Sequence, residues 1–366
     1  MVLRIKKELI EMSRCYHGGK IHEAAGRLGI DESSLIDFSV SLNPYLTLDP
    51  RDAVRQAYGS IFSYPDNRYE KFRNSAARFA GVGADNIIPG NGSMEIIRLI
   101  AGAVLEKGDI AAIPSPTFGE YERECRLFGA GIRRLPWDDV VDNKLSGLDG
   151  SRMAFFCNPN NPDGRMIPAP CMERIIKYCG EHDILAVVDE AFIDLADPAQ
   201  SVAALVEEYD NLFVMRSLTK CFAIPGMRLG FGIAGKAAAE ILDSARLTWN
   251  LDSIAAEIGV YYMDNAGPSL GASRAYIEKE RKWLSDRLDL IKGISPQPSA
   301  ANYFIADVSG TGMTAGDIAE KLLKEHILAR DCTSFGLPYH IRLAVRVRKD
   351  NERLVEAMLK AAGAKS

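Results

Sequence analysis

One stretch of the chain, residues 211–230, reads NLFVMRSLTKCFAIPGMRLG and decides the fold class. Its apolar start, 211–216, predicts a buried strand, and Lys220 follows soon after the end of that strand. Other apolar runs predict strands at 109–114, 152–157, 184–188 and 229–234, with helical spacing at 171–180 and 198–209. Strands that alternate with helices indicate an α/β fold whose mostly parallel sheet is covered on both faces. Ligands of such sheets bind beyond the carboxyl ends of the strands, which is where Lys220 is expected.

Beyond residue 265 the pattern changes to that of a smaller α+β unit. Its expected elements are a long charged helix at 274–291, strands at 302–308 and 341–347, and helices at 314–326 and 351–362. A chain of 366 residues exceeds one ordinary core, so we expect a large domain over 46–265 and a small domain over 266–366. Residues 1–45 lack a core of their own and are expected to pack against the small domain.

The composition is that of an ordinary soluble protein, with 47% hydrophobic and 25% charged residues. A net charge of −5 argues against a dedicated nucleic-acid binder. The start of the chain lacks the continuous apolar core of a signal peptide, and no apolar run is long enough to span a membrane. The seven cysteines are scattered singly, with no CxxC pair. This usage predicts reduced thiols in the cytoplasm, without a disulfide framework or a metal site.

The residues around Lys220 suit a cofactor that has both a carbonyl group and a phosphate. Ser217 and Thr219 precede the lysine, and Arg228 follows it eight residues later. A lysine in this setting can form an imine while the hydroxyl groups and the planar guanidinium bind the phosphate. Taken alone, the motif is explained as well by a surface lysine in a turn.

Three further motifs follow a predicted strand or open a helical run. Asp189 closes an apolar strand, where burial of its carboxylate is costly without a partner such as a protonated pyridine nitrogen. Asn161, in the segment 158–164, can donate a hydrogen bond to a ring oxygen. Residues 90–95 read GNGSME and precede the helical run 96–105, so their free N–H groups suit a phosphate. Taken singly, each motif is equally explained as a cap or a turn.

Together, the order and spacing of these motifs resemble the fold-type I pyridoxal-phosphate (PLP) enzymes, the aspartate-aminotransferase superfamily. The resemblance covers nearly the whole chain and implies a seven-stranded, mostly parallel sheet in the large domain. It implies that Lys220 binds PLP covalently and that Asp189 contacts the ring nitrogen. The other implied cofactor-binding residues are Gly92, Ser93, Met94, Phe118, Asn161, Ser217, Thr219 and Arg228. The resemblance also implies a homodimer in which Tyr64 reaches the cofactor phosphate of the neighbouring subunit.

Three arginines near the C-terminus narrow the choice of substrate. Arg342 and Arg346 alternate with apolar residues, which predicts that both point to one face of a strand. Arg330 follows the apolar run 327–329. The three side chains suit a phosphate and a carboxylate on one small molecule, although a solvated face of an edge strand also explains the pattern.

Within the superfamily, the chain resembles the threonine-phosphate decarboxylases first and the histidinol-phosphate aminotransferases second. The resemblance to the decarboxylases rests on the segments 17–19 and 37–44, on Phe192, where many relatives have tyrosine, and on Arg346. The substrate-binding residues that it implies are His17, Ser41, Asn43, Arg330, Arg342 and Arg346. Of these, Arg342 is expected to bind the carboxylate, and Arg330 and His17 the phosphate. The decarboxylases usually have asparagine in place of Ser41, which leaves open whether phosphothreonine or phosphoserine is preferred.

We therefore expect PLP-dependent decarboxylation of L-threonine O-3-phosphate to (R)-1-amino-2-propanol O-2-phosphate, as in cobalamin biosynthesis. The alternative that the sequence leaves open is transamination of histidinol phosphate with 2-oxoglutarate. The outcome depends on which Cα bond stands perpendicular to the PLP ring, and the sequence does not reveal that geometry. A PLP-binding regulator without turnover is disfavoured, because only about 45 residues precede the large domain and they contain no helix-turn-helix pattern.

Overall fold

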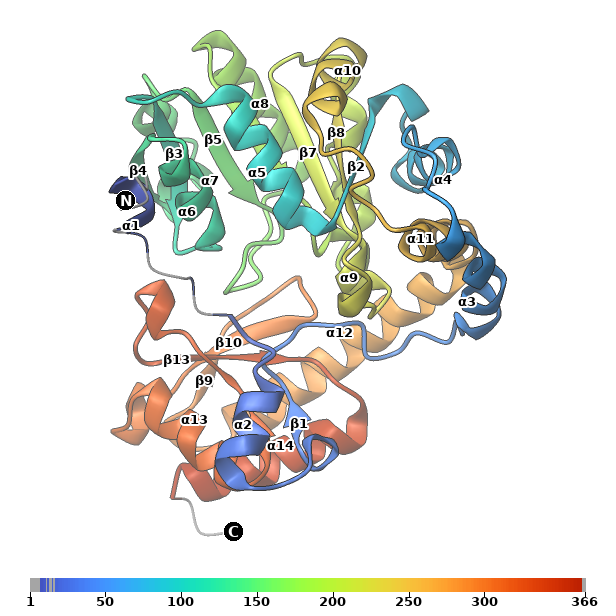
Figure 1. Ribbon diagram of the computed structural model, residues 1–366. Coiled ribbons are helices and arrows are strands. Elements are labelled where there is room, and N and C mark those ends of the chain that lie inside the picture. Colours follow the sequence, from blue (N-terminus) through green and yellow to red (C-terminus); the bar gives the residue numbers. More distant parts are fainter. Residues whose placement is uncertain (1–6, 11, 13–14, 16, 364–366) are drawn as a thin grey trace, which may run out of the picture.

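The computed structural model describes residues 7–10, 12, 15 and 17–363, and a seven-stranded sheet lies at its centre (Figure 1). The strands are β2 (Ile87–Gly90), β3 (Ile110–Ser115), β4 (Gly131–Pro136), β5 (Met153–Cys157), β6 (Leu185–Asp189), β7 (Leu212–Ser217) and β8 (Gly230–Ala234). Their order in the sheet is β2-β8-β7-β6-β5-β3-β4. Neighbours from β7 to β4 pair in parallel, whereas β8 runs antiparallel to both β7 and β2. The predicted class, an α/β fold with a mostly parallel seven-stranded sheet, is confirmed.

Helices cover both faces of this sheet (Figure 1). The helices of this part of the chain, most of which pack on the sheet, are α3 (Arg51–Ala57), α4 (Glu70–Ala80), α5 (Gly92–Val104), α6 (Glu120–Leu127), α7 (Trp137–Val141), α8 (Ala169–Glu181), α9 (Leu218–Cys221), α10 (Lys236–Ala245) and α11 (Ser253–Asn265). Successive residues of the central strands enter opposite cores: Phe155 and Val187 lie in one, Phe156 and Val188 in the other. Burial on both faces explains why these strands read as near-continuous apolar runs.

The five strands expected around this sheet are present, and two more were not predicted. β4 is an edge strand with two arginines and partly exposed side chains, and β2 is four residues long and contains a proline. Both therefore lack the apolar run that marks a central strand.

The prediction of a helix at 198–209 is wrong. Two short 3-10 turns stand there instead, Pro198–Gln200 and Ala203–Glu207. Between them, the hydroxyl of Ser201 and the backbone N–H of Val202 both donate to the buried carboxylate of Glu190, at 2.8 Å each. These two bonds hold the chain in a path that a continuous helix cannot follow.

The C-terminal part forms a four-stranded antiparallel sheet with helices packed on it (Figure 1). Its strands, in sheet order, are β12 (Arg330–Asp331), β13 (His340–Ala344), β10 (Tyr303–Asp307) and β9 (Ser295–Pro296). Its helices are α12 (Gly267–Asp289), α13 (Ala315–Lys324) and α14 (Arg348–Ala361). The strand predicted at 341–347 therefore ends at Ala344, three residues early.

Residues 21–37 lie beside this smaller sheet (Figure 1). β1 (Ile36–Asp37) pairs in parallel with β11 (Ile327–Leu328), and α2 (Ile21–Leu28) packs Ala24 and Ala25 against Leu323. The short helix α1 (Lys7–Ile10) precedes them. The domain limits 46–265 and 266–366 stay a prediction. Within the described ranges, no helix is both long and apolar enough to cross a membrane.

Candidate active site

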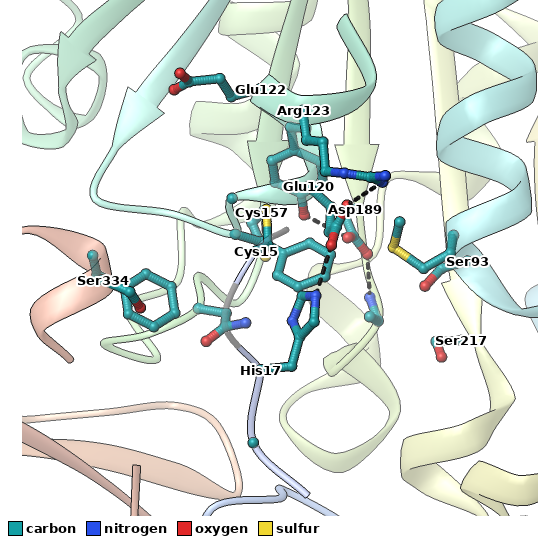
Figure 2. Close-up of a pocket in the computed structure, with 18 of the residues that line it drawn as sticks. Cys15, His17, Ser93, Glu120, Glu122, Arg123, Cys157, Asp189, Ser217 and Ser334 are labelled. Carbon is teal, nitrogen blue, oxygen red and sulfur yellow. Dashed lines mark hydrogen bonds and ion pairs between the residues drawn. The ribbon is translucent and has the colours of Figure 1, made fainter. Parts of the chain in front are cut away.

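A pocket of about 950 Å³ lies where the carboxyl ends of β5, β6 and β7 face the small sheet and the N-terminal segment. Most of the residues singled out from the sequence line it: His17, Ser41, Ser93, Met94, Phe118, Asn161, Asp189, Ser217, Thr219, Lys220, Arg228, Arg330 and Arg342. Figure 2 views this pocket from the side on which His17 and Glu120 meet. The topology brings these residues together because the ends of parallel strands meet at one edge of a sheet.

Lys220 lies in α9, the single helical turn that begins directly after β7. Burial lowers the pKa of its amine to about 8, and the positive charges of Arg342 and Arg228 add to the lowering. An amine with this pKa is neutral in a substantial fraction of molecules near neutral pH, which is the form that attacks a carbonyl group.

Asp189 is the last residue of β6 and is buried at the back of the pocket. The hydroxyl of Tyr121 donates to its Oδ2 at 2.5 Å, and the backbone N–H of Ala191 donates to its Oδ1 at 2.9 Å. Burial raises the pKa of Asp189 to about 6 although these two hydrogen bonds act in the opposite direction. A carboxylate so buried and oriented suits a cationic partner, such as a protonated ring nitrogen.

Tyr121 was not predicted from the sequence. It is fully buried in α6, and its ring stacks on that of Phe155 with centroids 4.8 Å apart. Its position three residues after Phe118 gives no helical signal, because Phe118 lies before the start of α6. The rings of Tyr121 and Phe118 do meet edge to face, 5.5 Å apart.

The start of α5 and the loop before β8 form a cradle that suits a phosphate. Gly92 has φ +73°, and a Cβ atom on it would come within 2.6 Å of Nη2 of Arg228. The guanidinium therefore reaches the helix N-terminus only because position 92 is glycine. Ser93 follows at the same terminus, and the hydroxyls of Ser217 and Thr219, which also line the pocket, lie 2.9 Å apart. Free N–H groups, hydroxyls and a guanidinium are the groups that bind phosphate in proteins.

Arg342 lies on β13 of the small sheet, and its side chain contacts Asn161, which belongs to the large unit. It donates from Nη1 to Oδ1 of Asn161 and from Nη2 to the carbonyl of Ser39 at 2.7 Å. Its Nε is buried without a hydrogen-bond partner among the described residues, as is Oγ of Ser41. Since the carbonyl of the Asn161 side chain accepts from Arg342, its amide nitrogen remains the atom that can donate to a ligand.

Arg330 and Arg342 are direct partners across β12 and β13, and both line the pocket. Arg346, predicted to share a strand face with Arg342, lies beyond the end of β13 and outside the pocket lining. It donates to Asp350 at 2.8 Å and to the carbonyl of Asp37 at 3.1 Å. The alternation that suggested a shared face fails because the extended chain ends at Ala344.

Three other predicted residues also lie outside the pocket lining, namely Gly92, whose place at the phosphate cradle is given above, Asn43 and Tyr64. Asn43 is buried, and its side chain donates to the carbonyl of Cys221 and to Ser273, at 2.8 and 3.0 Å. These bonds hold the turn that carries Lys220. Tyr64 is 78% exposed and stacks on Trp249, with ring centroids 4.3 Å apart. Within one chain, neither side chain contributes to the wall of the site.

The comparisons with known proteins agree with this geometry. The family description "Aminotransferase class I and II" matches residues 33–358. The chain belongs to this family. Histidinol-phosphate aminotransferases recur among its similar proteins; the one from Methanothermobacter thermautotrophicus is 30% identical, over 98% of this chain and 97% of its own. A threonine-phosphate decarboxylase from Salmonella typhimurium is 32% identical, over 93% of this chain and 95% of its own.

Solved structures of the class I and II aminotransferase family have the same fold. A histidinol-phosphate aminotransferase from Clostridium acetobutylicum has a TM-score of 0.82 at 27% identity, covering 90% of this chain and 99% of that chain. The aspartate aminotransferase from Thermus thermophilus also has a TM-score of 0.82, at 19% identity, over 98% of this chain and 100% of that chain. The predicted aspartate-aminotransferase-like fold is thereby confirmed.

Enzymes of the class I and II aminotransferase family use pyridoxal 5′-phosphate, and the residues of this pocket fit that cofactor. The cradle at Gly92 and Arg228 suits its phosphate, and the buried carboxylate of Asp189 suits its ring nitrogen. Lys220 is an amine of lowered pKa that lines the same pocket. The protein is a PLP-dependent enzyme of this family, as the sequence predicted.

Proposed function

We propose that this protein decarboxylates L-threonine O-3-phosphate. The observation that carries the proposal is the direct pairing of Arg330 with Arg342 at the pocket. Partners on adjacent antiparallel strands have Cα atoms about 5 Å apart, so the two guanidinium groups suit two anionic groups on one small molecule. Phosphothreonine has a carboxylate and a phosphate on neighbouring carbons, whereas histidinol phosphate has a phosphate and no carboxylate.

When bound, PLP supplies an electron sink for the bonds at the substrate Cα. In this proposal Lys220 would bind PLP covalently. When the bond from Cα to the carboxylate breaks and carbon dioxide leaves, the ammonium form of Lys220, present near neutral pH because its pKa is about 8, would donate the proton that Cα takes up. Asp189 keeps a proton on the ring nitrogen, and Tyr121 orients that carboxylate. The phosphate of the cofactor is bound by Gly92, Ser93, Ser217, Thr219 and Arg228, while Met94, Phe118 and Asn161 contact its ring.

The substrate is bound on the opposite wall. Arg342 is held in place by Asn161 and Ser39, and its partnerless Nε is available for the substrate carboxylate. Arg330 and His17 bind the substrate phosphate, and Oγ of Ser41 supplies one further donor. We no longer assign Asn43 or Arg346 to the substrate, since both have structural partners.

The similar proteins support a second candidate, transamination of histidinol phosphate with 2-oxoglutarate. That name recurs among the relatives at 27–30% identity, so by number they favour this reaction over decarboxylation. The residues that bind the cofactor would have the same roles in this transamination. Arg330 and Arg342 then bind the two carboxylates of 2-oxoglutarate instead of the two anionic groups of phosphothreonine.

Turnover assays separate the two candidates. The PLP-loaded enzyme is incubated with phosphothreonine alone, and carbon dioxide and aminopropanol phosphate are measured. Decarboxylation without an oxo acid supports the proposal. Glutamate formation from histidinol phosphate and 2-oxoglutarate, with no carbon dioxide from phosphothreonine, would overturn it. Phosphoserine is assayed in parallel, because one methyl group changes kcat/KM by a factor that corresponds to about 1–3 kcal/mol.

We further propose that two copies of the chain form the active dimer. Large apolar side chains are exposed near Tyr64, among them Phe62, at 77%, and Leu247, at 71%. Several large apolar side chains exposed in one region are expected to be covered in solution. In the dimer, Tyr64 of each copy reaches the cofactor phosphate of the other.

Mixed dimers test this arrangement. Tyr64→Ala chains are combined with Lys220→Ala chains. If Tyr64 acts in the neighbouring site, each mixed dimer has one site with both defects and one intact site, so its activity exceeds that of either parent. If mixing restores no activity, Tyr64 does not act across the interface.

A further inference from the structure

Described residues of the N-terminal segment lie over the mouth of the pocket, and one carboxylate of α6 contacts them there. Met12, Cys15 and His17 all line the pocket. Nε2 of His17 lies 2.6 Å from Oε1 of Glu120, the first residue of α6. Figure 2 shows the imidazole and this carboxylate pointing toward each other at the edge of the pocket. The contact joins segments that are 103 residues apart in sequence.

Glu120 is the fixed member of this pair. Its side chain is 7% exposed, whereas that of His17 is 48% exposed. Nη1 of Arg123 donates to its other oxygen at 3.2 Å, and the same nitrogen donates to Glu124 at 2.7 Å. Arg98 of α5 then holds Glu124 through two bonds of 2.7 and 2.9 Å. The carboxylate of Glu120 is therefore anchored to two helices of the large unit.

The protonation state of Glu120 determines which ring nitrogen of its partner, His17, faces the pocket. Burial opposes ionisation, but the hydrogen bonds from His17 and Arg123 outweigh it and hold the pKa of Glu120 below its ordinary value. An ionised carboxylate only accepts hydrogen bonds, so Nε2 of His17 carries the hydrogen. The ring orientation is thereby fixed, and Nδ1 is the atom left for a ligand.

A buried carboxylate at the mouth of a pocket for a phosphate needs an explanation. Two like charges at close range repel each other, and the repulsion is strong where water is excluded. An imidazolium, which carries a hydrogen on each nitrogen, can donate to the carboxylate on one side and to the phosphate on the other, and it separates the two negative charges. The charged groups that face this imidazole are Glu120 and Arg123 of α6, with the thiol of Cys15 on its own segment.

We propose that Glu120 is a positioning residue for substrate binding: it fixes the ring of His17 at the angle at which Nδ1 meets the substrate phosphate. This inference rests on the proposed function only in requiring a phosphate monoester as substrate. Both candidate reactions meet that requirement. Glu120 itself does not contact the phosphate.

The test compares Glu120→Ala, Glu120→Gln, His17→Ala and the double variant in the PLP-loaded enzyme. Glu120→Ala raises KM for the phosphorylated substrate about 10-fold and leaves kcat within about twofold, because only binding is affected. Glu120→Gln, which keeps an acceptor oxygen, recovers most of this loss. The double variant is no worse than His17→Ala alone, since Glu120 acts through the histidine.

Glu122→Ala is the matched control. Glu122 lies on the same helix and also lines the pocket, but its partners are Arg126 and Arg134. Its loss leaves KM unchanged. Affinities for phosphothreonine and for threonine, measured by calorimetry, give a second readout: Glu120→Ala weakens the binding of phosphothreonine and not that of threonine.

Three outcomes would overturn the inference. An unchanged KM in Glu120→Ala, or a further loss on adding it to His17→Ala, shows that Glu120 does not act through His17. An equal loss of threonine and phosphothreonine binding shows a structural role. If phosphothreonine is not decarboxylated but Glu120→Ala still raises KM for histidinol phosphate, the proposed decarboxylation fails and the role of Glu120 stands.

Discussion

The two walls of the pocket differ in how their polar atoms are bonded. On the wall built by the large sheet, Asp189 accepts from Tyr121 and Ala191, and Ser217 is bonded to Thr219. On the facing wall, Oγ of Ser41 and Nε of Arg342 are buried without partners within the part of the chain that the structure describes. Groups that are bonded internally keep their geometry without a ligand, whereas buried partnerless groups cost free energy until one arrives. In the proposed function, the wall that binds the cofactor is thus preorganised, and the facing wall would be completed by the substrate.

The largest effect is expected on the cofactor wall, from Lys220→Ala. Activity should fall on the order of 10⁴-fold, because the covalent link to PLP and the proton exchange are lost together. Borohydride reduction followed by mass measurement of the intact chain should detect covalent PLP in the wild type and none in the variant. Covalent PLP on the variant would show that another residue binds the cofactor.

Asp189→Asn should lower kcat about 10²- to 10³-fold, since the ring nitrogen loses the charge that keeps it protonated. The shape of the side chain and its contact with Tyr121 are retained, so the variant should still bind PLP. Steady-state kinetics and a PLP titration measure the two quantities separately. Activity near the wild-type level would remove Asp189 from its assigned role.

Arg342→Ala tests the opposite wall. KM for phosphothreonine should rise about 10- to 100-fold, which corresponds to the loss of charge-assisted hydrogen bonds, while the affinity for PLP changes little. The matched control is Arg346→Ala, four residues further on and bonded to Asp350 outside the pocket, which should leave KM unchanged. If Arg342→Ala weakened PLP and substrate equally, the distinction between the two walls would fail.

Tyr121→Phe sharpens the comparison, because it removes one internal bond from the preorganised wall. Its hydroxyl helps to keep Asp189 ionised, so the pKa of Asp189 should rise from about 6 toward neutrality. The fall in kcat, about 10-fold, should be larger near about pH 6 than near about pH 8. Tyr178→Phe, whose hydroxyl bonds Asp149 at the surface, is the control and should show no change in the pH profile. A pH-independent loss would mean that Tyr121 acts only through packing.

The last effect concerns the stability of the apoprotein rather than its activity. Burial raises the pKa of Asp189 from 3.8 to about 6, so the folded chain binds this proton more tightly than the unfolded chain does. Stability from this group is therefore lost as the pH rises from about 4 to about 6, by about 3 kcal/mol in total. Urea unfolding of apo Asp189→Asn and wild type at about pH 4.5 and about pH 7.5 should show the variant gaining relative stability at the higher pH. The same difference at both pH values would contradict the raised pKa.

The cofactor wall was predictable from the sequence because its motifs are local. Asp189, Asn161 and Lys220 each follow a strand closely, and the ends of parallel strands meet at one edge of a sheet. Tyr121 was missed because its partner, Asp189, lies 68 residues away on another element. A single buried tyrosine has no local pattern that distinguishes it from an ordinary core residue.

The substrate wall was predictable only in part, because its geometry depends on where the short strands end and on how the segments between them turn. Both Arg330 and Arg342 were singled out from the sequence. Their direct pairing across β12 and β13 was not predicted, because the segment that connects the two strands has no sequence pattern that marks a turn. Arg346 was misassigned because β13 ends at Ala344. Glu120 was not predicted, since its meaning comes from a contact with His17 103 residues away.

The close approach of Arg228 to Gly92 has a consequence for how this enzyme can vary. The guanidinium occupies the space in which a side chain at position 92 would begin. A side chain at position 92 would have to displace this guanidinium, and the φ of +73° strains any residue other than glycine there even where the arginine is shortened. An engineering library aimed at the phosphate cradle should therefore keep glycine at position 92 and vary position 228 alone.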